Sequence, residues 1–158
     1  MDKAFDRVSR CPGQALDDGR VNAGHPRVVA EGLGTGGERW TLTTAGSGRR
    51  RRTMAEVVEV DGRRWGAGFG GPPLPPGRRL AIFVGRSGAG AHLVIVRAAA
   101  DVRAVVATLS DGTREDLSLH GDAEEFGARL AVLVYPAELD LHGLVLLDGD
   151  GLELPDTL

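Results

Sequence analysis

Cysteine is almost absent from the sequence, because Cys11 is the only one among 158 residues. An intramolecular disulfide and a thiolate metal cluster are therefore excluded. Long apolar runs are also missing: the longest, such as 80–84 and 130–135, fall far short of the roughly 20 residues that cross a membrane. The N-terminal residues lack the apolar segment of a secretory signal, so we expect a cytoplasmic protein without membrane contact.

Lysine and aromatic residues are scarce as well. Lys3 is the only lysine, 18 of the 19 basic residues are arginine, and only 4% of the residues are Phe, Trp or Tyr. This arginine bias is typical of a GC-rich bacterial genome, so a single arginine is weak evidence for guanidinium chemistry. The shortage of aromatic side chains for base stacking, together with a net charge of −3, disfavours nucleic acid as a partner.

Glycine, by contrast, is abundant, with 24 residues spread along the chain without a regular period. Such a distribution predicts many tight turns. Charge is distributed unevenly: residues 1–80 carry 14 basic and 9 acidic groups, whereas residues 81–158 carry 5 and 13. The two halves either complement each other within the fold or leave the basic half to face an acidic partner.

Short apolar segments alternate with glycine-rich turns from Arg27 onward, at the spacing of roughly 8–12 residues that is typical of β-strands. Residues 1–26 have no sustained periodicity. We therefore expect an irregular N-terminal arm over 1–26, with room for one helical turn at 15–18, and a single β-rich domain over 27–158. The expected strands are 27–32, 38–44, 54–60, 63–69, 79–84, 91–98, 102–109, 113–119, 126–135, 141–147 and 151–154.

Asp-Gly pairs separate several of these strands, at Asp61-Gly62, at Asp111-Gly112 and twice within 148–151. Asp and Gly tolerate the positive φ angles of a type I′ turn, whose twist matches that of paired strands. The sequence therefore predicts hairpins at these places. For the whole domain it predicts an all-β fold, an antiparallel β-sandwich.

Two segments also fit a helix, which leaves an α+β fold as an alternative. The apolar residues of 101–110 follow a helical stripe, and in 122–135 Asp122 and Glu125 have a spacing like that of a helix-capping box. We favour strands, because the first segment ends directly in Asp-Gly. The second is dense in β-branched and aromatic residues and contains Gly127.

The C-terminal half carries a series of turn motifs: a DV-x-x-V-x-x-x-L-x-DG hairpin, an FG-x-R segment ending in proline, and a D-x-DG turn. The residues concerned are Asp101, Val102, Val105, Leu109, Asp111 and Gly112, then Phe126, Gly127, Arg129 and Pro136, then Asp148, Asp150 and Gly151. This series resembles uncharacterised immunoglobulin-like β-sandwich domains of GC-rich bacteria. The resemblance implies an immunoglobulin-like sandwich and no activity.

Three glycine-rich loops invite a comparison with phosphate-binding loops. The segments 32–37 and 66–71 both match GxGxxG, but strands rather than the required helix are expected after them, so we interpret both as connections between strands. The loop 85–92 has alanine where a phosphate-binding lysine is needed. Ser87 and His92 in this loop are the candidate nucleophile and base of a small hydrolase or ligand-binding enzyme, with an acidic residue from the C-terminal half. The alternative interpretation of this loop is a plain β-turn.

The sequence contains no metal-binding pattern that we can assign. The four histidines lack close metal-ligand spacing, and the acidic residues of 148–153 lack the spacing of an EF-hand. We therefore expect no metal, no cofactor and no catalytic set.

A run of four arginines, Arg49 to Arg52, lies between two expected strands. Adjacent guanidinium groups repel each other, so the run is either a solvated loop or a contact for anions. The candidate binding residues are these four and the pairs that could reinforce them: Arg49, Arg50, Arg51, Arg52, Arg63, Arg64, Arg78 and Arg79.

These observations lead to three functional hypotheses. The first is a non-catalytic binding or interaction module that contacts a protein partner through loops; an acidic partner would complement the arginines. The second is the small hydrolase or ligand-binding enzyme that uses Ser87 and His92. The third is a self-associating structural component, since many strands leave open sheet edges.

Overall fold

The computed structural model describes residues 25–71, 74, 76–88 and 90–155. The helical turn expected at 15–18, and nearly all of the arm expected over 1–26, lie outside the described residues. Of the described residues, 54% lie in strands and 6% in helical turns. The prediction of an all-β, antiparallel fold is therefore confirmed, and the α+β alternative is wrong.

Each expected strand has a counterpart in the structure. In the described part of the chain the strands are β1 (Arg27–Leu33), β2 (Arg39–Ala45), β3 (Arg52–Val58), β4 (Arg64–Gly70), β5 (Leu80–Arg86), β6 (His92–Ala98), β7 (Ala104–Leu109), β8 (Arg114–Leu117), β9 (Arg129–Tyr135), β10 (Leu141–Leu147) and β11 (Glu153–Leu154). Two short helical turns accompany them, η1 (Gly48–Arg50) and α2 (Ala123–Phe126). No helix of the described residues has both the length and the apolar character to cross a membrane.

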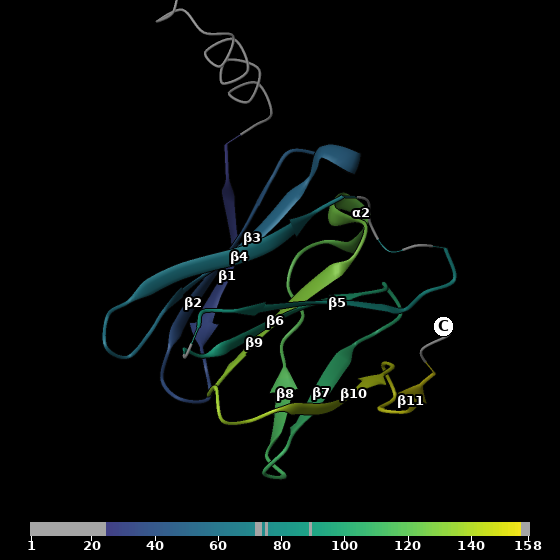
Figure 1. Ribbon diagram of the computed structural model, residues 1–158. Coiled ribbons are helices and arrows are strands. Elements are labelled where there is room, and N and C mark those ends of the chain that lie inside the picture. Colours follow the sequence, from purple (N-terminus) through teal and green to yellow (C-terminus); the bar gives the residue numbers. More distant parts are fainter. Residues whose placement is uncertain (1–24, 72–73, 75, 89, 156–158) are drawn as a thin grey trace, which may run out of the picture.

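The strands form three antiparallel sheets. The N-terminal sheet has the order β1-β2-β3-β4, the central sheet β5-β6-β9, and the C-terminal sheet β11-β10-β7-β8. Figure 1 shows the central sheet between the other two. Strands that are neighbours in the N-terminal sheet are also neighbours in the sequence. After β4 the chain alternates between the other two sheets: β5 and β6 belong to the central sheet, β7 and β8 to the C-terminal sheet, β9 to the central sheet again, and β10 and β11 to the C-terminal sheet.

Two strands of the central sheet, β6 and β9, are buried on both faces, which gives the fold two sheet-on-sheet interfaces. On one face Leu93 and Ile95 of β6 pack with Leu42 and Val57 of the N-terminal sheet. On the other face Val94, Val96 and Ala98 pack with residues of the C-terminal sheet, Val105, Leu109 and Leu146 among them. Strands covered on both sides need apolar residues at successive positions, and β6 and β9 are nearly continuous apolar runs for this reason. This arrangement is consistent with a β-sandwich.

The hairpins at the Asp-Gly pairs are present, but the turns differ from the expected type I′. Among the described residues only glycines have positive φ, including Gly62 (90°) and Gly112 (87°). Each of these two hairpins closes with a hydrogen bond from the glycine N–H to the carbonyl three residues earlier, at Glu59 and Leu109. A three-residue loop that ends in glycine needs one positive φ rather than two, and the aspartate supports it by accepting a hydrogen bond two residues on.

The segment 122–135 contains both a helical turn and a strand. Asp122 caps α2, since its Oδ1 accepts a hydrogen bond from the N–H of Glu124 at 2.7 Å, and Gly127 ends the turn with a φ of 74°. The strand therefore begins at Arg129, later than the 126 expected from sequence. The helix-capping signal acts only over the first turn. The apolar residues that follow are buried on both faces of β9, and this burial favours a strand.

Candidate functional site

The arginine run lies on the connection between β2 and β3, where the chain folds into η1. Gly46 and Gly48 have φ angles of 76° and 54°, and a Cβ at Gly46 would come within 2.7 Å of the Arg50 carbonyl oxygen. The turn is closed by hydrogen bonds from the N–H of Arg50 and of Arg51 to the carbonyls three residues earlier. Consequently the four arginines do not form one extended row: they surround a bend.

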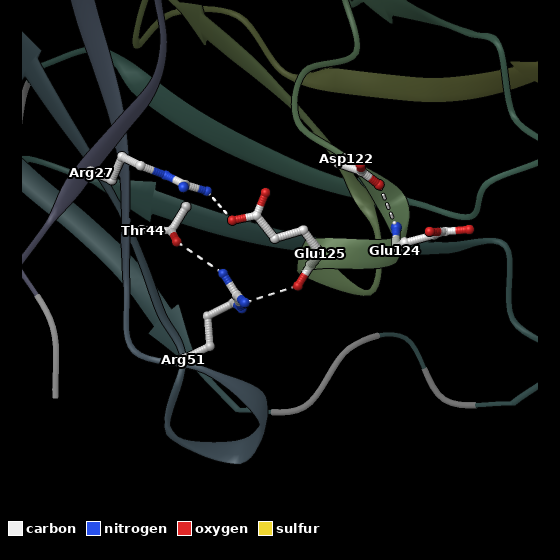
Figure 2. Close-up of polar contacts among 6 residues, drawn as sticks. All are labelled: Arg27, Thr44, Arg51, Asp122, Glu124 and Glu125. Atoms are coloured by element: carbon white, nitrogen blue, oxygen red, sulfur yellow. Dashed lines mark hydrogen bonds and ion pairs between the residues drawn. The ribbon is translucent and has the colours of Figure 1, made fainter.

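Arg51 is the member of the run that turns toward the protein. Its Nη1 donates to Thr44 Oγ1 at 3.1 Å and its Nη2 donates to the Glu125 carbonyl at 2.9 Å. Its guanidinium also lies 4.8 Å from the centre of the Phe126 ring. Figure 2 shows Arg51 reaching from the start of β3 to α2. Arg51 thus joins the N-terminal sheet to the helical turn.

Arg27 reaches the same helical turn from β1. Its guanidinium forms an ion pair with the Glu125 carboxylate and lies 5.4 Å from the centre of the Phe126 ring. Figure 2 shows Arg27 of β1 and Arg51, which precedes β3, converging on Glu125. Part of the basic N-terminal half is therefore complemented by the acidic C-terminal half within the fold. Because both side chains of this ion pair are about half exposed, it contributes about 0–1 kcal/mol.

Four of the predicted binding arginines are both exposed and without a partner among the described residues. Arg49 and Arg50 on η1, Arg52 at the start of β3 and Arg78 before β5 are exposed, and no acceptor among the described residues pairs with them. The first three lie around the same bend, which we call the arginine turn (Arg49, Arg50 and Arg52).

The other predicted arginines are engaged within the protein. Arg63 pairs with Asp61 at 2.7 Å and Arg64 with Glu56 at 2.6 Å. Arg79 pairs with Asp101 at 2.8 Å and also donates to the Pro155 carbonyl. The backbone hydrogen bond from Arg63 is the largest cause of the lowered pKa of Asp61, and the hydrogen bond to Glu56 raises the pKa of Arg64. These pairs fix local geometry and leave fewer donors for a partner.

Ser87 and His92 lie close in sequence but form no nucleophile–base pair. His92 is 5% exposed, and its ring meets that of Tyr135 edge-on at 5.0 Å. Burial, and then the charge of Arg86, lower the pKa of His92, whereas Asp140 acts in the opposite direction. Among the described residues the hydrogen bond at Ser87 is its carbonyl accepting from the N–H of Gly90 at 2.6 Å. A serine nucleophile needs a base within hydrogen-bond reach, and among the described residues no hydrogen bond joins the Ser87 hydroxyl to His92.

Two carboxylates that no motif marks hold the glycine loops in place. Glu59 accepts hydrogen bonds from Trp65 Nε1 at 2.9 Å and from the N–H of Ala91 at 3.0 Å. It thereby joins the β3–β4 hairpin to the loop before β6. Glu38 is 6% exposed and accepts from the N–H of Gly36 at 3.1 Å. In the loop 32–37, which matches GxGxxG, a backbone N–H is therefore bonded to the carboxylate of Glu38. The negative charge of this carboxylate would repel a phosphate group.

A cleft of about 260 Å³ lies between β1, β8 and β9. Its polar lining comes from segments that are far apart in the sequence, with Glu31 on β1, Glu115 and Asp116 on β8, and His120 just before α2. The glycine pattern of 32–37 is the sequence signal at this place, because Gly32 and Gly34 both line the cleft. Within the described residues no group of three or more His, Cys, Asp or Glu side chains could hold a metal ion.

In comparisons with protein families, curated proteins and solved structures, nothing matches the chain. The resemblance to immunoglobulin-like domains of GC-rich bacteria therefore stays a prediction.

Proposed function

We propose that the protein is a non-catalytic interaction module that contacts an acidic protein partner through the arginine turn. The observation that carries this proposal is that the arginines of the run have different environments. Arg51 donates hydrogen bonds to Thr44 and Glu125, whereas Arg49, Arg50 and Arg52 are exposed. An anchored turn fixes the backbone from which the exposed guanidinium groups extend. Less conformational entropy is then lost when a partner binds.

The surroundings of the turn favour an acidic protein surface over nucleic acid. Asp122, Glu124 and Glu125 belong to the neighbouring α2 turn and its cap. A phosphate backbone that extended across this end of the molecule would meet these carboxylates, whereas a protein surface can match both signs of charge. Guanidinium groups also pair well with carboxylates, because their planar donors match the two carboxylate oxygens.

The test is the triple variant Arg49→Ser, Arg50→Ser, Arg52→Ser, with Arg51 retained to hold the turn. Binding of an oligoglutamate peptide is measured by fluorescence anisotropy at low salt and at physiological salt. We expect the affinity to fall by at least about tenfold at 0.01 M salt, where the Debye length is about 30 Å, and by less at 0.15 M, where it is about 8 Å.

The matched control is Arg39→Ser, Arg86→Ser, Arg114→Ser, which removes the same charge from exposed positions on other strands. If the two triple variants lose the same affinity, the peptide responds to net charge and the proposal is wrong. The same conclusion follows if the arginine-turn variant binds as the parent does.

Self-association is a second candidate function, favoured by the position of β5. This strand is at the edge of the central sheet, and Ile82 and Val84 on it are 46% and 54% exposed. An unpaired apolar edge is a template for a strand of a second copy. Light scattering over a concentration series tests this, and the mass should fall to that of a monomer in Val84→Lys. A concentration-independent monomer in the parent protein refutes it.

A further inference from the structure

The cleft between β1, β8 and β9 is acidic and lies away from the arginine turn. Its lining includes the acidic residues Glu31, Glu115 and Asp116 and no arginine. The two features occupy opposite ends of the first hairpin: Arg27 and Ala45 are at the end near the turn, whereas Leu33 and Arg39 are at the other. At about 3.3 Å per residue, the seven-residue strand β1 separates them by roughly 20 Å. The cleft is thus a separate place on the molecule.

Trp40 forms one wall of the cleft and has an unused hydrogen-bond donor. The side chain is 7% exposed, yet among the described residues nothing accepts a hydrogen bond from its Nε1. The other tryptophan differs, since Trp65 Nε1 donates to Glu59 at 2.9 Å. Trp40 Nε1 is not among the buried polar atoms of the described residues that lack a partner, so solvent reaches it. A group that enters the cleft can therefore take the place of water as the acceptor of this N–H.

Gly32 gives this donor room. A Cβ at Gly32 would lie 2.7 Å from Cε2 and 3.1 Å from Nε1 of Trp40. Any larger residue would force the indole to shift. The glycine thus keeps backbone close to the ring, and both residues line the cleft together.

His120 supplies a second ring beside Trp40. The two ring centroids are 6.2 Å apart, with an interplanar angle of 63°. Burial, and then the charge of Arg129, lower the pKa of His120, so the imidazole is uncharged at neutral pH. The lining of the cleft therefore includes three acidic residues, two aromatic rings and an N–H donor, and none of its lining residues is positively charged at that pH.

We propose that this cleft binds an organic cation: a small molecule or a side chain with its backbone that carries a guanidinium or ammonium group and, in addition, a hydrogen-bond acceptor. The carboxylates attract the cation, the indole contributes a cation–π contact, and Trp40 Nε1 donates to the acceptor. The volume of about 260 Å³ is near the lower end of the roughly 300–1,000 Å³ of small-molecule sites, so it fits one amino-acid-sized group. Such a group is available as a free small amine or as the side chain of a basic peptide.

The experiment follows the indole N–H resonances of the full chain in ¹H–¹⁵N spectra during titration. The main probe is Nα-acetyl-arginine amide, and Nα-acetyl-citrulline amide is its uncharged counterpart of nearly the same shape. We expect a saturable shift of the Trp40 resonance with the arginine derivative alone. The Trp65 resonance serves as an internal control, because its donor is already bonded to Glu59. Argininamide distinguishes the sources, because it keeps the guanidinium group and an amide acceptor but has a free amine: binding equal to that of the acetylated derivative indicates a free amine, and weaker binding indicates a peptide side chain.

The carboxylates are tested with the triple variant Glu31→Gln, Glu115→Gln, Asp116→Asn, which we expect to weaken binding by about tenfold. The matched variant Glu138→Gln, Asp150→Asn, Glu153→Gln removes the same charge from exposed positions outside this cleft and should stay within about twofold of the parent. An unchanged Trp65 resonance reports that each variant is folded. Equal binding of the citrulline derivative, equal loss in both triple variants, or no shift of Trp40 with any probe would overturn the proposal.

Discussion

Replacement of Arg51 by alanine is the most discriminating perturbation of the arginine run. We expect it to lower the free energy of unfolding by about 2 kcal/mol, while Arg50→Ala changes it by less than about 0.5 kcal/mol. The two residues are adjacent and chemically identical. Their environments differ, because Arg51 is half-buried against Thr44 and Glu125 and Arg50 is exposed.

The magnitude follows from the contacts that alanine removes. Arg51 makes two hydrogen bonds, to Thr44 Oγ1 at 3.1 Å and to the Glu125 carbonyl at 2.9 Å, each of which is worth about 0.5–1.5 kcal/mol. The contact with the Phe126 ring at 4.8 Å adds about 0.5–1 kcal/mol at a partly exposed site. The lower half of the combined range is appropriate, since the bond to Glu125 is solvent-exposed.

The assay is urea denaturation of the parent, Arg51→Ala and Arg50→Ala, with the midpoint and the slope determined separately. We expect the midpoint to fall in Arg51→Ala without a change of slope, because the fold is retained. Arg51→Lys should be intermediate, since lysine keeps the charge but cannot reach two acceptors with a planar fork. Hydrogen exchange should also accelerate at the α2 turn in Arg51→Ala alone.

Equal midpoints for Arg51→Ala and Arg50→Ala would refute this reasoning. The run would then behave as four solvated side chains, and the anchoring of the turn, on which the proposed function depends, would be lost. A loss in both variants of about 2 kcal/mol would refute it in the same way, by showing that position within the turn is irrelevant.

Three further predictions concern the core, a buried carboxylate and the histidines. Leu93→Ala, at a fully buried position of β6, should cost about 2–5 kcal/mol in urea denaturation, and a cost under 1 kcal/mol would contradict the burial of β6 on both faces. Glu59→Ala leaves the N–H groups of Trp65 and Ala91 without their acceptor and should cost about 1–3 kcal/mol; an unchanged Trp65 indole resonance would argue against this bond. Because the pKa values of His92 and His120 are lowered in the folded state, the unfolded state binds more protons, so stability should fall as pH drops below the unfolded value of about 6.5. His92→Phe should flatten that part of the profile, and an identical pH profile would refute the assignment.

The amino-acid sequence by itself determined where the strands lie. Turn residues act locally, so Asp61-Gly62 and Asp111-Gly112 marked two hairpins that the structure confirms. The type of turn was not determined in this way, because one positive φ or two depends on the register of the paired strands. The N-cap at Asp122 was visible in the sequence only as an alternative to the favoured strand, since capping is a contact over two or three residues.

Tertiary structure alone decided which face each strand buries and which polar groups meet. The apolar runs of β6 and β9 indicated burial on both faces, but nothing local states that the N-terminal sheet covers one face and the C-terminal sheet the other. The same holds for the arginines: Arg49 and Arg51 have the same chemistry, and the contacts with Thr44, Glu125 and Phe126 distinguish Arg51. The acidic cleft is the strongest case, because it joins Glu31 of β1 to Glu115 of β8. Such contacts depend on how sheets pack, and packing energy is a property of surfaces that the chain brings together only when it has folded.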